Sequence, residues 1–185
     1  MEGDNFRGEW LKRKHNLGLE FPNLPYFVDG NLKMTESMAI HQYIADKWDP
    51  TLLGNTPKER AKVMMMGNII GDLAKAVTVP HYTSGSKEES LGKVPMQLPP
   101  ILKFMGKNKF LCTAEKPTWV DFFFLEQVNR LRWVTDGGIF TDYPALKFYY
   151  DEMTSLPQLK EHLENPNAPE KKMQFNGKTA LLNGA

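Results

Sequence analysis

The sequence predicts a small α/β domain followed by an all-α domain, and two patterns lead to this fold class. Residues 26–34 have the strand propensities and the central Asp29-Gly30 pair of a β-hairpin, which lies between two short segments of helical character. The later apolar residues recur at helical spacing. Two of the later segments begin with a hydroxyl residue and an acid three positions on, at Thr56–Glu59 and Thr118–Asp121, as in a helix capping box.

Composition argues against several classes of partner and cofactor. Lys and Arg number 23 and Asp and Glu number 22, so no excess charge implies a nucleic acid or an acidic membrane as partner. Cys112 is the only cysteine, which excludes an intramolecular disulfide, and no apolar run approaches the roughly 20 residues of a membrane span. With Glu2, Asp4 and Arg7 near its start, the chain does not begin like a signal peptide. We therefore expect a cytoplasmic protein without a bound metal ion.

The first elements are a short helix and the hairpin. The segment 1–19 carries Trp10 among basic residues, and its simplest interpretation is a helix with a solvated basic face. Pro25 holds Leu24 extended and permits a cis bond between them, which would turn the Leu24 N–H and C=O outward. An extended peptide could then pair with Leu24 as a short antiparallel strand.

A helix is predicted directly after the hairpin, with its N-terminus near Ser37. The free N–H groups and positive dipole end there would suit a carboxylate, while Glu36 beside it would suit an ammonium. Together they would recognise the head group of an α-amino acid; the alternative is an ordinary capped helix. One apolar stripe of this helix consists of Ile40, Tyr43, Ile44 and Trp48.

These residues resemble a known family. Residues 21–26, the hairpin, and the run from Thr35 to Ile40 are similar to the glutathione-binding half of the cytosolic glutathione S-transferases, and Asn23-Leu24-Pro25 resembles the mu class. The likeness includes Trp10, Leu11 and Lys14 and extends through the helical region. It implies a truncated thioredoxin-like domain of helix, hairpin and helix, followed by the family's all-helical domain. The expected bounds are 1–48 and 56–165 for the two domains, 49–55 for a linker and 166–185 for an extended tail.

The resemblance also implies site residues. Those matching glutathione contacts are Arg7, Trp10, Lys14, Asn23, Leu24, Glu36, Ser37 and Asp72. In the family, the counterparts of Trp10 and Lys14 hold the glycine carboxylate, and that of Asp72 reaches the glutathione amine of the neighbouring subunit. The counterpart of Tyr82 lies over the electrophile pocket, where its hydroxyl acts as a general acid. For Asp72 the alternative is a solvent-facing helix acid, and for Tyr82 a structural tyrosine.

The sequence departs from the family pattern at its start, which matches the family's second helix. The resemblance implies that a first strand, helix and second strand are missing, and with them the tyrosine that stabilises the glutathione thiolate. Neither Tyr26 nor Tyr43 matches that residue, so no catalytic residue is assigned. A thiol of ordinary pKa would be a poor nucleophile at neutral pH. The strand 26–28 would also present a bare edge, for a missing segment, a partner protein or a rearranged start to cover.

In the helical domain we expect structural roles. Pro80 is predicted to break or kink the helix that starts at Thr56, and Pro99-Pro100 to interrupt the helix of residues 94–107. Asp121 is expected to cap the next helix and is assigned no chemistry. Further helices are predicted from residues 142–146 and 156–157.

Phe21 corresponds to the aromatic residue through which mu-class subunits join as two-fold dimers. Gln42 stands where those enzymes commonly carry an arginine at the two-fold axis, so the partner of Phe21 is a second copy or another protein. Three functions remain open: a transferase that conjugates glutathione to electrophiles, a non-catalytic transferase-like subunit of a larger assembly, and a protein that binds glutathione or carries ligands. The family favours the first function, and the residues present favour the second.

Overall fold

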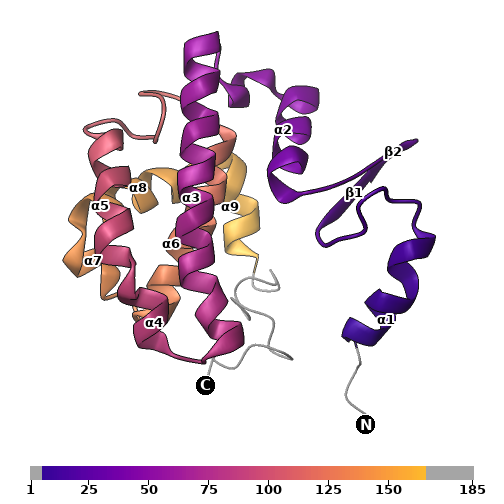
Figure 1. Ribbon diagram of the computed structural model, residues 1–185. Coiled ribbons are helices and arrows are strands. Elements are labelled where there is room, and N and C mark those ends of the chain that lie inside the picture. The colour runs from indigo at the N-terminus through magenta and orange to yellow at the C-terminus, as the bar shows by residue number, and fades with distance from the viewer. Residues whose placement is uncertain (1–5, 166–185) are drawn as a thin grey trace. The chain divides into compact units, whose positions relative to one another are not determined.

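The computed structural model describes residues 6–165, with side chains from Gly8 onward, and divides the chain into two compact units. Unit 1 is Met1–Leu53 and unit 2 is Gly54–Ala185. The predicted fold class is confirmed, since unit 1 contains a two-stranded hairpin with helices and the described part of unit 2 is helical (Figure 1). The division falls within the predicted linker, where Pro50–Leu53 forms the 3₁₀ helix η2. The predicted tail, residues 166–185, lies outside the described residues.

The hairpin of unit 1 is antiparallel and follows a short helical segment. Tyr26 pairs with Thr35 and Asp29 with Leu32, so the two-residue loop is Gly30-Asn31, one position later than predicted. Gly30 has a φ of +58°, which suits the tight loops that join twisted strands. The Leu24–Pro25 peptide bond is cis. The elements before α2 are α1 (Phe6–Arg13), η1 (Lys14–Asn16), β1 (Tyr26–Asp29) and β2 (Leu32–Thr35).

Helix α2 (Ser37–Trp48) buries less of its apolar stripe than the sequence predicts. Ile40 is buried, whereas Ile44 is 38% exposed and Trp48 is 60% exposed. Unit 1 is small, and so small a unit has too little apolar surface to cover a whole helix face. The Trp48 ring instead meets Phe27 edge-on, with the ring centroids 6.5 Å apart.

A polar cluster ties the hairpin to α2. The Tyr43 hydroxyl donates to Asp29 Oδ2 at 2.8 Å, and the Lys47 ammonium pairs with the same oxygen. Lys47 also lies 4.8 Å from the centre of the Trp48 ring. The bonds from Lys47 and Tyr43 lower the pKa of Asp29. The end of β1 is therefore held against the last turns of α2 by charge as well as by apolar contact.

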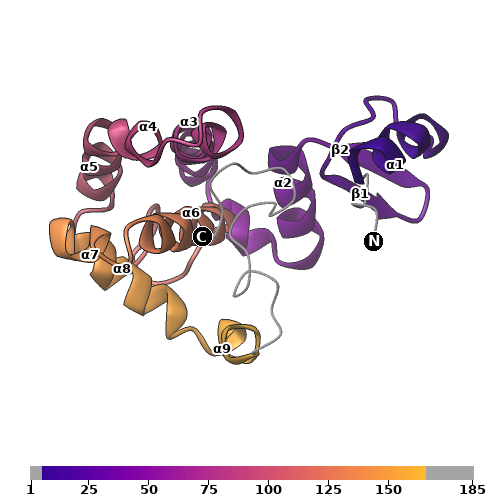
Figure 2. The same ribbon diagram turned by 90° about the horizontal axis from the view of Figure 1, so that it is seen from below.

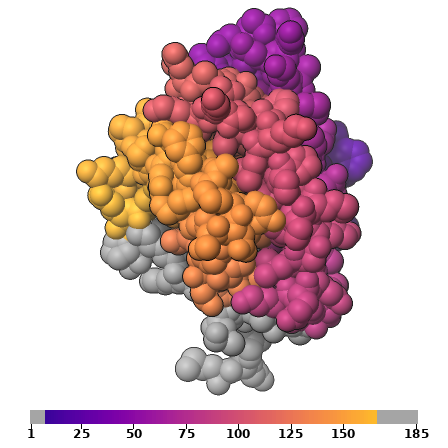
Figure 3. Space-filling model, turned by 90° about the vertical axis from the view of Figure 1, so that its left-hand side faces the viewer, coloured from indigo at the N-terminus to yellow at the C-terminus, as the bar shows by residue number. Residues whose placement is uncertain are grey.

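The described part of unit 2 is built around two helices, α3 and α6, which pack against each other (Figures 1 and 2). Val63, Ile70 and Leu73 of α3 and Phe124 and Val128 of α6 are fully buried in this core. Figure 3 shows the outer face of the unit, where α4, α5 and α8 form a continuous surface. The helices are α3 (Pro57–Thr83), α4 (Lys87–Gly92), α5 (Val94–Met105), α6 (Trp119–Val134), α7 (Ile139–Asp142), α8 (Pro144–Thr154) and α9 (Pro157–Glu164).

The structure contradicts two predicted helix breaks at proline, whereas the alternative of a kink at Pro80 stays a prediction. Helix α3 continues through Pro80 to Thr83, and α5 runs without interruption through Pro99-Pro100. Both prolines of the pair are exposed, while the face of α5 on Leu98 and Ile101 is buried in the core. Packing of an amphipathic face can outweigh the cost of proline in a helix, about 3 kcal/mol per residue. None of the described helices is long and apolar enough to cross a membrane.

A buried histidine joins α4 to the end of α3. His81 is fully buried, and its Nε2 lies 3.0 Å from Ser90 Oγ. The Ser90 hydroxyl donates to the Val77 carbonyl at 2.7 Å. His81 therefore serves packing between two helices.

The buried carboxylate of Asp121 organises the start of α6, as predicted. Its Oδ1 accepts from the Leu111 N–H at 2.8 Å, and its Oδ2 accepts from the Thr118 N–H at 2.7 Å and from the Thr118 hydroxyl at 2.9 Å. The Tyr149 hydroxyl donates to the Asp121 carbonyl at 2.7 Å. Burial raises the pKa of Asp121 to about 6, against the lowering effect of these hydrogen bonds. One residue thus joins a loop, the N-terminus of α6, and α8.

We predict that Asp121→Ala destabilises the protein by about 3 kcal/mol, because it leaves the buried N–H groups of Leu111 and Thr118 without an acceptor. Glu59→Ala is the matched control: its carboxylate also accepts a backbone N–H at a helix start, that of Asn55 at 2.7 Å, but this pair is exposed. The control should lose about 0.5 kcal/mol. Urea denaturation followed by circular dichroism measures both losses, and equal losses would contradict the structural role given to Asp121.

Candidate functional site

The hairpin brings two predicted parts of the site to the same end of the sheet. Because Tyr26 pairs with Thr35, the chain enters β1 from Leu24 and leaves β2 toward Glu36 at one end. The turn lies at the opposite end. Leu24 and Ser37, which are 13 positions apart in sequence, each lie two residues beyond this pair.

The N-terminus of α2 offers backbone donors. The first bond of this helix runs from the Ile40 N–H to the Glu36 carbonyl at 3.0 Å, so the N–H groups of Ser37, Met38 and Ala39 have no partner inside the helix. The side chain of the N-cap residue, Glu36, makes no capping hydrogen bond. Backbone N–H groups with the positive end of the helix dipole form a site that attracts a carboxylate.

Glu36, at the N-cap of α2, has an unusual backbone conformation. Its φ is +71° and its ψ is 106°, and its side chain is exposed. A residue with a Cβ is strained in this region, and such strain is concentrated at ligand-binding sites. The acid of Glu36 is therefore adjacent in sequence to the uncapped N–H groups of α2. A zwitterion could place its ammonium on this acid and its carboxylate on these N–H groups.

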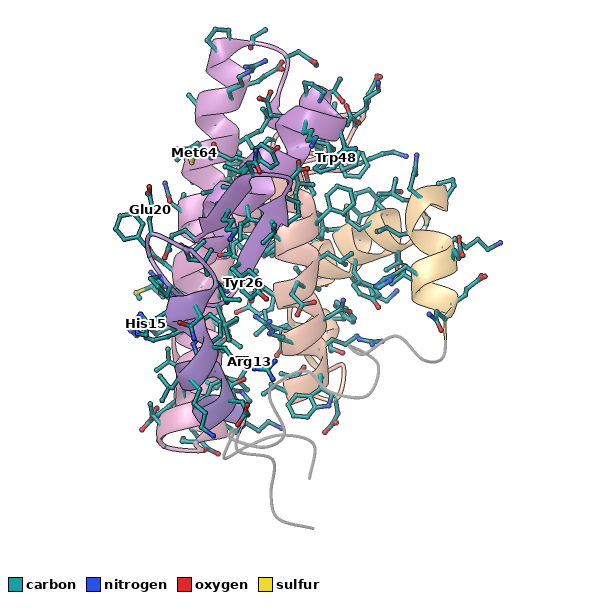
Figure 4. All side chains as sticks on the ribbon, turned by 90° about the vertical axis from the view of Figure 1, so that its right-hand side faces the viewer. Arg13, His15, Glu20, Tyr26, Trp48 and Met64 are labelled. Atoms are coloured by element: carbon teal, nitrogen blue, oxygen red, sulfur yellow. The ribbon has the colours of Figure 1, made fainter. Side chains whose placement is uncertain are left out.

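The helix α1 contributes an aromatic ring and a cation. The Trp10 ring is stacked on Tyr26 of β1 with centroids 6.1 Å apart and an interplanar angle of 13°. Tyr26 is labelled in Figure 4. Trp10 and Lys14 are both half-buried, Lys14 in η1. The backbone of Arg7 lies in α1, but its side chain lies outside the described part of the structure.

In the loop before β1, one hydrogen bond joins two neighbouring residues. The Leu24 N–H donates to Asn23 Oδ1 at 2.9 Å, a local contact of the kind that Asn side chains make in turns. Leu24 itself is 42% exposed. A peptide that paired with Leu24 would therefore have to displace the Asn23 side chain from this N–H.

The remaining predicted residues belong to other elements of the chain. Asp72 and Tyr82 belong to α3 of unit 2, where both are exposed and stand about 15 Å apart along the helix axis. Phe21, in the loop before β1, is 74% exposed. Burial raises the pKa of the Cys112 thiol to about 12, which makes it a weak nucleophile. Within residues 6–165, no group of three or more His, Cys, Asp or Glu side chains could hold a metal ion.

Two residues that shape the site were missed at the level of sequence. Tyr26 supports the Trp10 ring, and Lys33 donates to the Leu17 carbonyl at 2.7 Å. An aromatic residue on an exposed strand position was a usable signal for Tyr26. No pattern indicated the contact of Lys33, because its partner lies 16 residues away in a loop.

Comparison with known proteins identifies relatives across both units. Residues 1–46 match the family model of the glutathione S-transferase N-terminal domain, and residues 72–166 match that of the C-terminal domain. The chain is 35% identical over 169 residues to the class-mu 26 kDa isozyme 7 glutathione S-transferase of Fasciola hepatica, covering 89% of this chain and 75% of the relative. It is 34% identical over 169 residues to the class-mu 26 kDa isozyme of Schistosoma japonicum, covering 89% and 73%. The crystal structure of the glutathione S-transferase Blo t 8 superposes with a TM-score of 0.77 and 27% identity, covering 94% of this chain and 82% of that one.

We predict that Glu36→Gly stabilises unit 1 by about 1 kcal/mol, because glycine adopts a positive φ without strain and this relief exceeds its extra entropy in the unfolded state. Glu20→Gly is the matched control, since Glu20 is an exposed acid in a loop with an ordinary φ. It should be neutral or destabilising by up to about 1 kcal/mol. The protection of unit 1 amides in native-state hydrogen exchange measures both changes. A loss of stability in Glu36→Gly would contradict the strain.

Proposed function

Since the chain belongs to the glutathione S-transferase family and resembles its mu class, we propose that unit 1 binds glutathione. The observation that carries the proposal is the uncapped N-terminus of α2 with Glu36 at its N-cap. These groups suit the two charges of the γ-glutamyl end of glutathione. Its carboxylate would bind to the N–H groups of α2, and its ammonium would bind to the side chain of Glu36.

The rest of the tripeptide would extend over the hairpin toward α1. The backbone of Leu24, in the Asn23–Leu24 loop, would pair with the cysteine residue of glutathione. The indole N–H of Trp10 and the ammonium of Lys14, with Arg7, would hold the glycine carboxylate, one as a directional donor and the other as a mobile charge. Asp72 would contact the glutathione amine of a neighbouring subunit.

We further propose that conjugation by these residues is weak. Thiolate formation needs a donor at the sulfur, and the Tyr43 hydroxyl is already committed to Asp29. The hydrogen bond to the Asp29 carboxylate raises the pKa of Tyr43. Tyr82 would assist an electrophile or leaving group as a general acid and would leave the thiol pKa unchanged. A glutathione thiol near its ordinary pKa of about 8.5 is only a few per cent ionised at neutral pH.

A second candidate function is a non-catalytic subunit of a larger assembly. The exposed ring of Phe21 favours it, together with β1, which has a strand partner on one side only among the described residues. Such an edge pairs readily with another strand. A cytoplasmic location suits both functions, because the single cysteine provides no intramolecular disulfide.

We predict binding of glutathione without strong activation of its thiol. The protein should be retained on immobilised glutathione, and Lys14→Met should weaken that retention. Lys12→Met is the control, because it removes a neighbouring charge that is paired with Glu9 at 3.0 Å.

The thiolate absorbance of bound glutathione should titrate near pH 8.5, and an aryl halide should be conjugated little faster than in solution. A thiol pKa below 7 with rapid turnover would contradict weak catalysis, whereas failure of retention would contradict glutathione binding.

We also propose that Phe21 is the anchor of a dimer of two copies of this chain. An aromatic residue entering an apolar pocket commonly contributes 2 kcal/mol or more to an interface, about a thirtyfold change in dissociation constant.

We therefore predict that Phe21→Ser shifts the protein from dimer to monomer in sedimentation equilibrium. Phe148→Ser is the control, since Phe148 is an exposed aromatic residue of α8, 46% exposed, outside the proposed anchor. A wild-type protein that is monomeric at all concentrations would favour the assembly subunit instead.

A further inference from the structure

Lys33 of β2 connects the hairpin to the loop that follows η1. Its ammonium donates to the Leu17 carbonyl at 2.7 Å. The next residue, Gly18, has a φ of +68°, and a Cβ built there would lie 2.9 Å from Lys33 Nζ. The loop therefore closes tightly on the ammonium, and glycine leaves the space for it.

The proposed glutathione ligands of unit 1 come from two segments. Trp10 and Lys14 lie on α1 and η1, whereas Leu24, Glu36 and Ser37 lie at one end of the hairpin and on α2. A tripeptide that contacts both groups needs them at a fixed separation. The contacts that join the two segments therefore determine the fit of the ligand.

Among the described residues, two contacts join these segments at different points. The Trp10 ring is stacked on Tyr26, and the Leu17 carbonyl is bonded to Lys33. A stacked contact resists separation but permits sliding, since apolar attraction is not directional. The bond from the Lys33 ammonium limits the distance between β2 and the Leu17 carbonyl. Lys14 lies in the chain between the two anchors, so both together fix its position.

We infer that Lys33 is a positioning residue for the glycine end of the glutathione pocket. The inference rests on the proposed function and deepens it. Lys33 acts through Leu17, because it holds the α1–η1 segment in register with the hairpin and thereby places Trp10 and Lys14 where the glycine carboxylate binds. The γ-glutamyl end, held by Glu36 and the N-terminus of α2, does not depend on this bond.

A comparison of two ligands tests this role. Glutathione and γ-glutamylcysteine share the γ-glutamyl and cysteine residues, but the dipeptide lacks the glycine. Isothermal titration of the wild-type chain should show a preference for glutathione. In Lys33→Met, the affinity for glutathione should fall about tenfold, because a charge-assisted contact to its glycine carboxylate is misplaced. The affinity for the dipeptide should stay unchanged. Peptides covering residues 11–20 should also exchange amide hydrogen faster in the variant, while those of α2 should not.

Two further variants separate positioning from simple loss of charge. Lys12→Met removes a positive charge from the same unit and should leave both affinities unchanged. Gly18→Ala keeps the charge of Lys33 but forces its ammonium away from Leu17, so it should reproduce the selective loss. Circular dichroism checks that each variant is folded.

The outcomes distinguish this inference from the proposed function. If the wild-type chain binds neither ligand, glutathione binding itself is overturned. If the wild-type chain binds glutathione, but Lys33→Met weakens both ligands equally or neither, the positioning role alone is overturned. A Gly18→Ala variant that keeps the full preference for glutathione would overturn it as well.

Discussion

The register of the β1–β2 hairpin is the constraint on which the candidate site depends. Pairing of Tyr26 with Thr35 places the loop of Leu24 and the start of α2 at one end of a two-stranded sheet. A slip of one residue would turn every hairpin side chain to the opposite face and would separate Tyr26 from Trp10. The polar and aromatic contacts around the hairpin are meaningful only in this register.

The two units are stabilised in different ways. Unit 2 has a deep apolar core, and its principal polar centre, Asp121, is buried and fully hydrogen-bonded. Unit 1 relies on contacts near the surface, such as Lys47 with Asp29 and Lys33 with Leu17. Exposed contacts of this kind contribute little to stability but set geometry. Unit 1, for which we propose ligand binding, therefore depends on polar contacts near the surface.

Strain and unsatisfied donors meet where α2 begins. Glu36 has a positive φ, and the N–H groups after it have no partner within the helix. A capped helix with an ordinary N-cap residue would be more stable but would offer nothing to a ligand. The proposed function binds the backbone of the tripeptide through complementary groups. It lacks a comparable group for the thiol, because the Tyr43 hydroxyl is hydrogen-bonded to Asp29.

The sequence by itself determined the fold class, the family resemblance, the hairpin and the capping role of Asp121, because each depends on local propensity or short spacing. It did not determine that α3 and α5 would continue through their prolines, nor that Trp48 would stay exposed. Packing against distant residues decides both outcomes. Only the tertiary structure paired Tyr26 with Trp10 and Lys33 with Leu17. Contacts between residues this far apart leave no periodic pattern in the chain, because they arise from the folded path of the backbone.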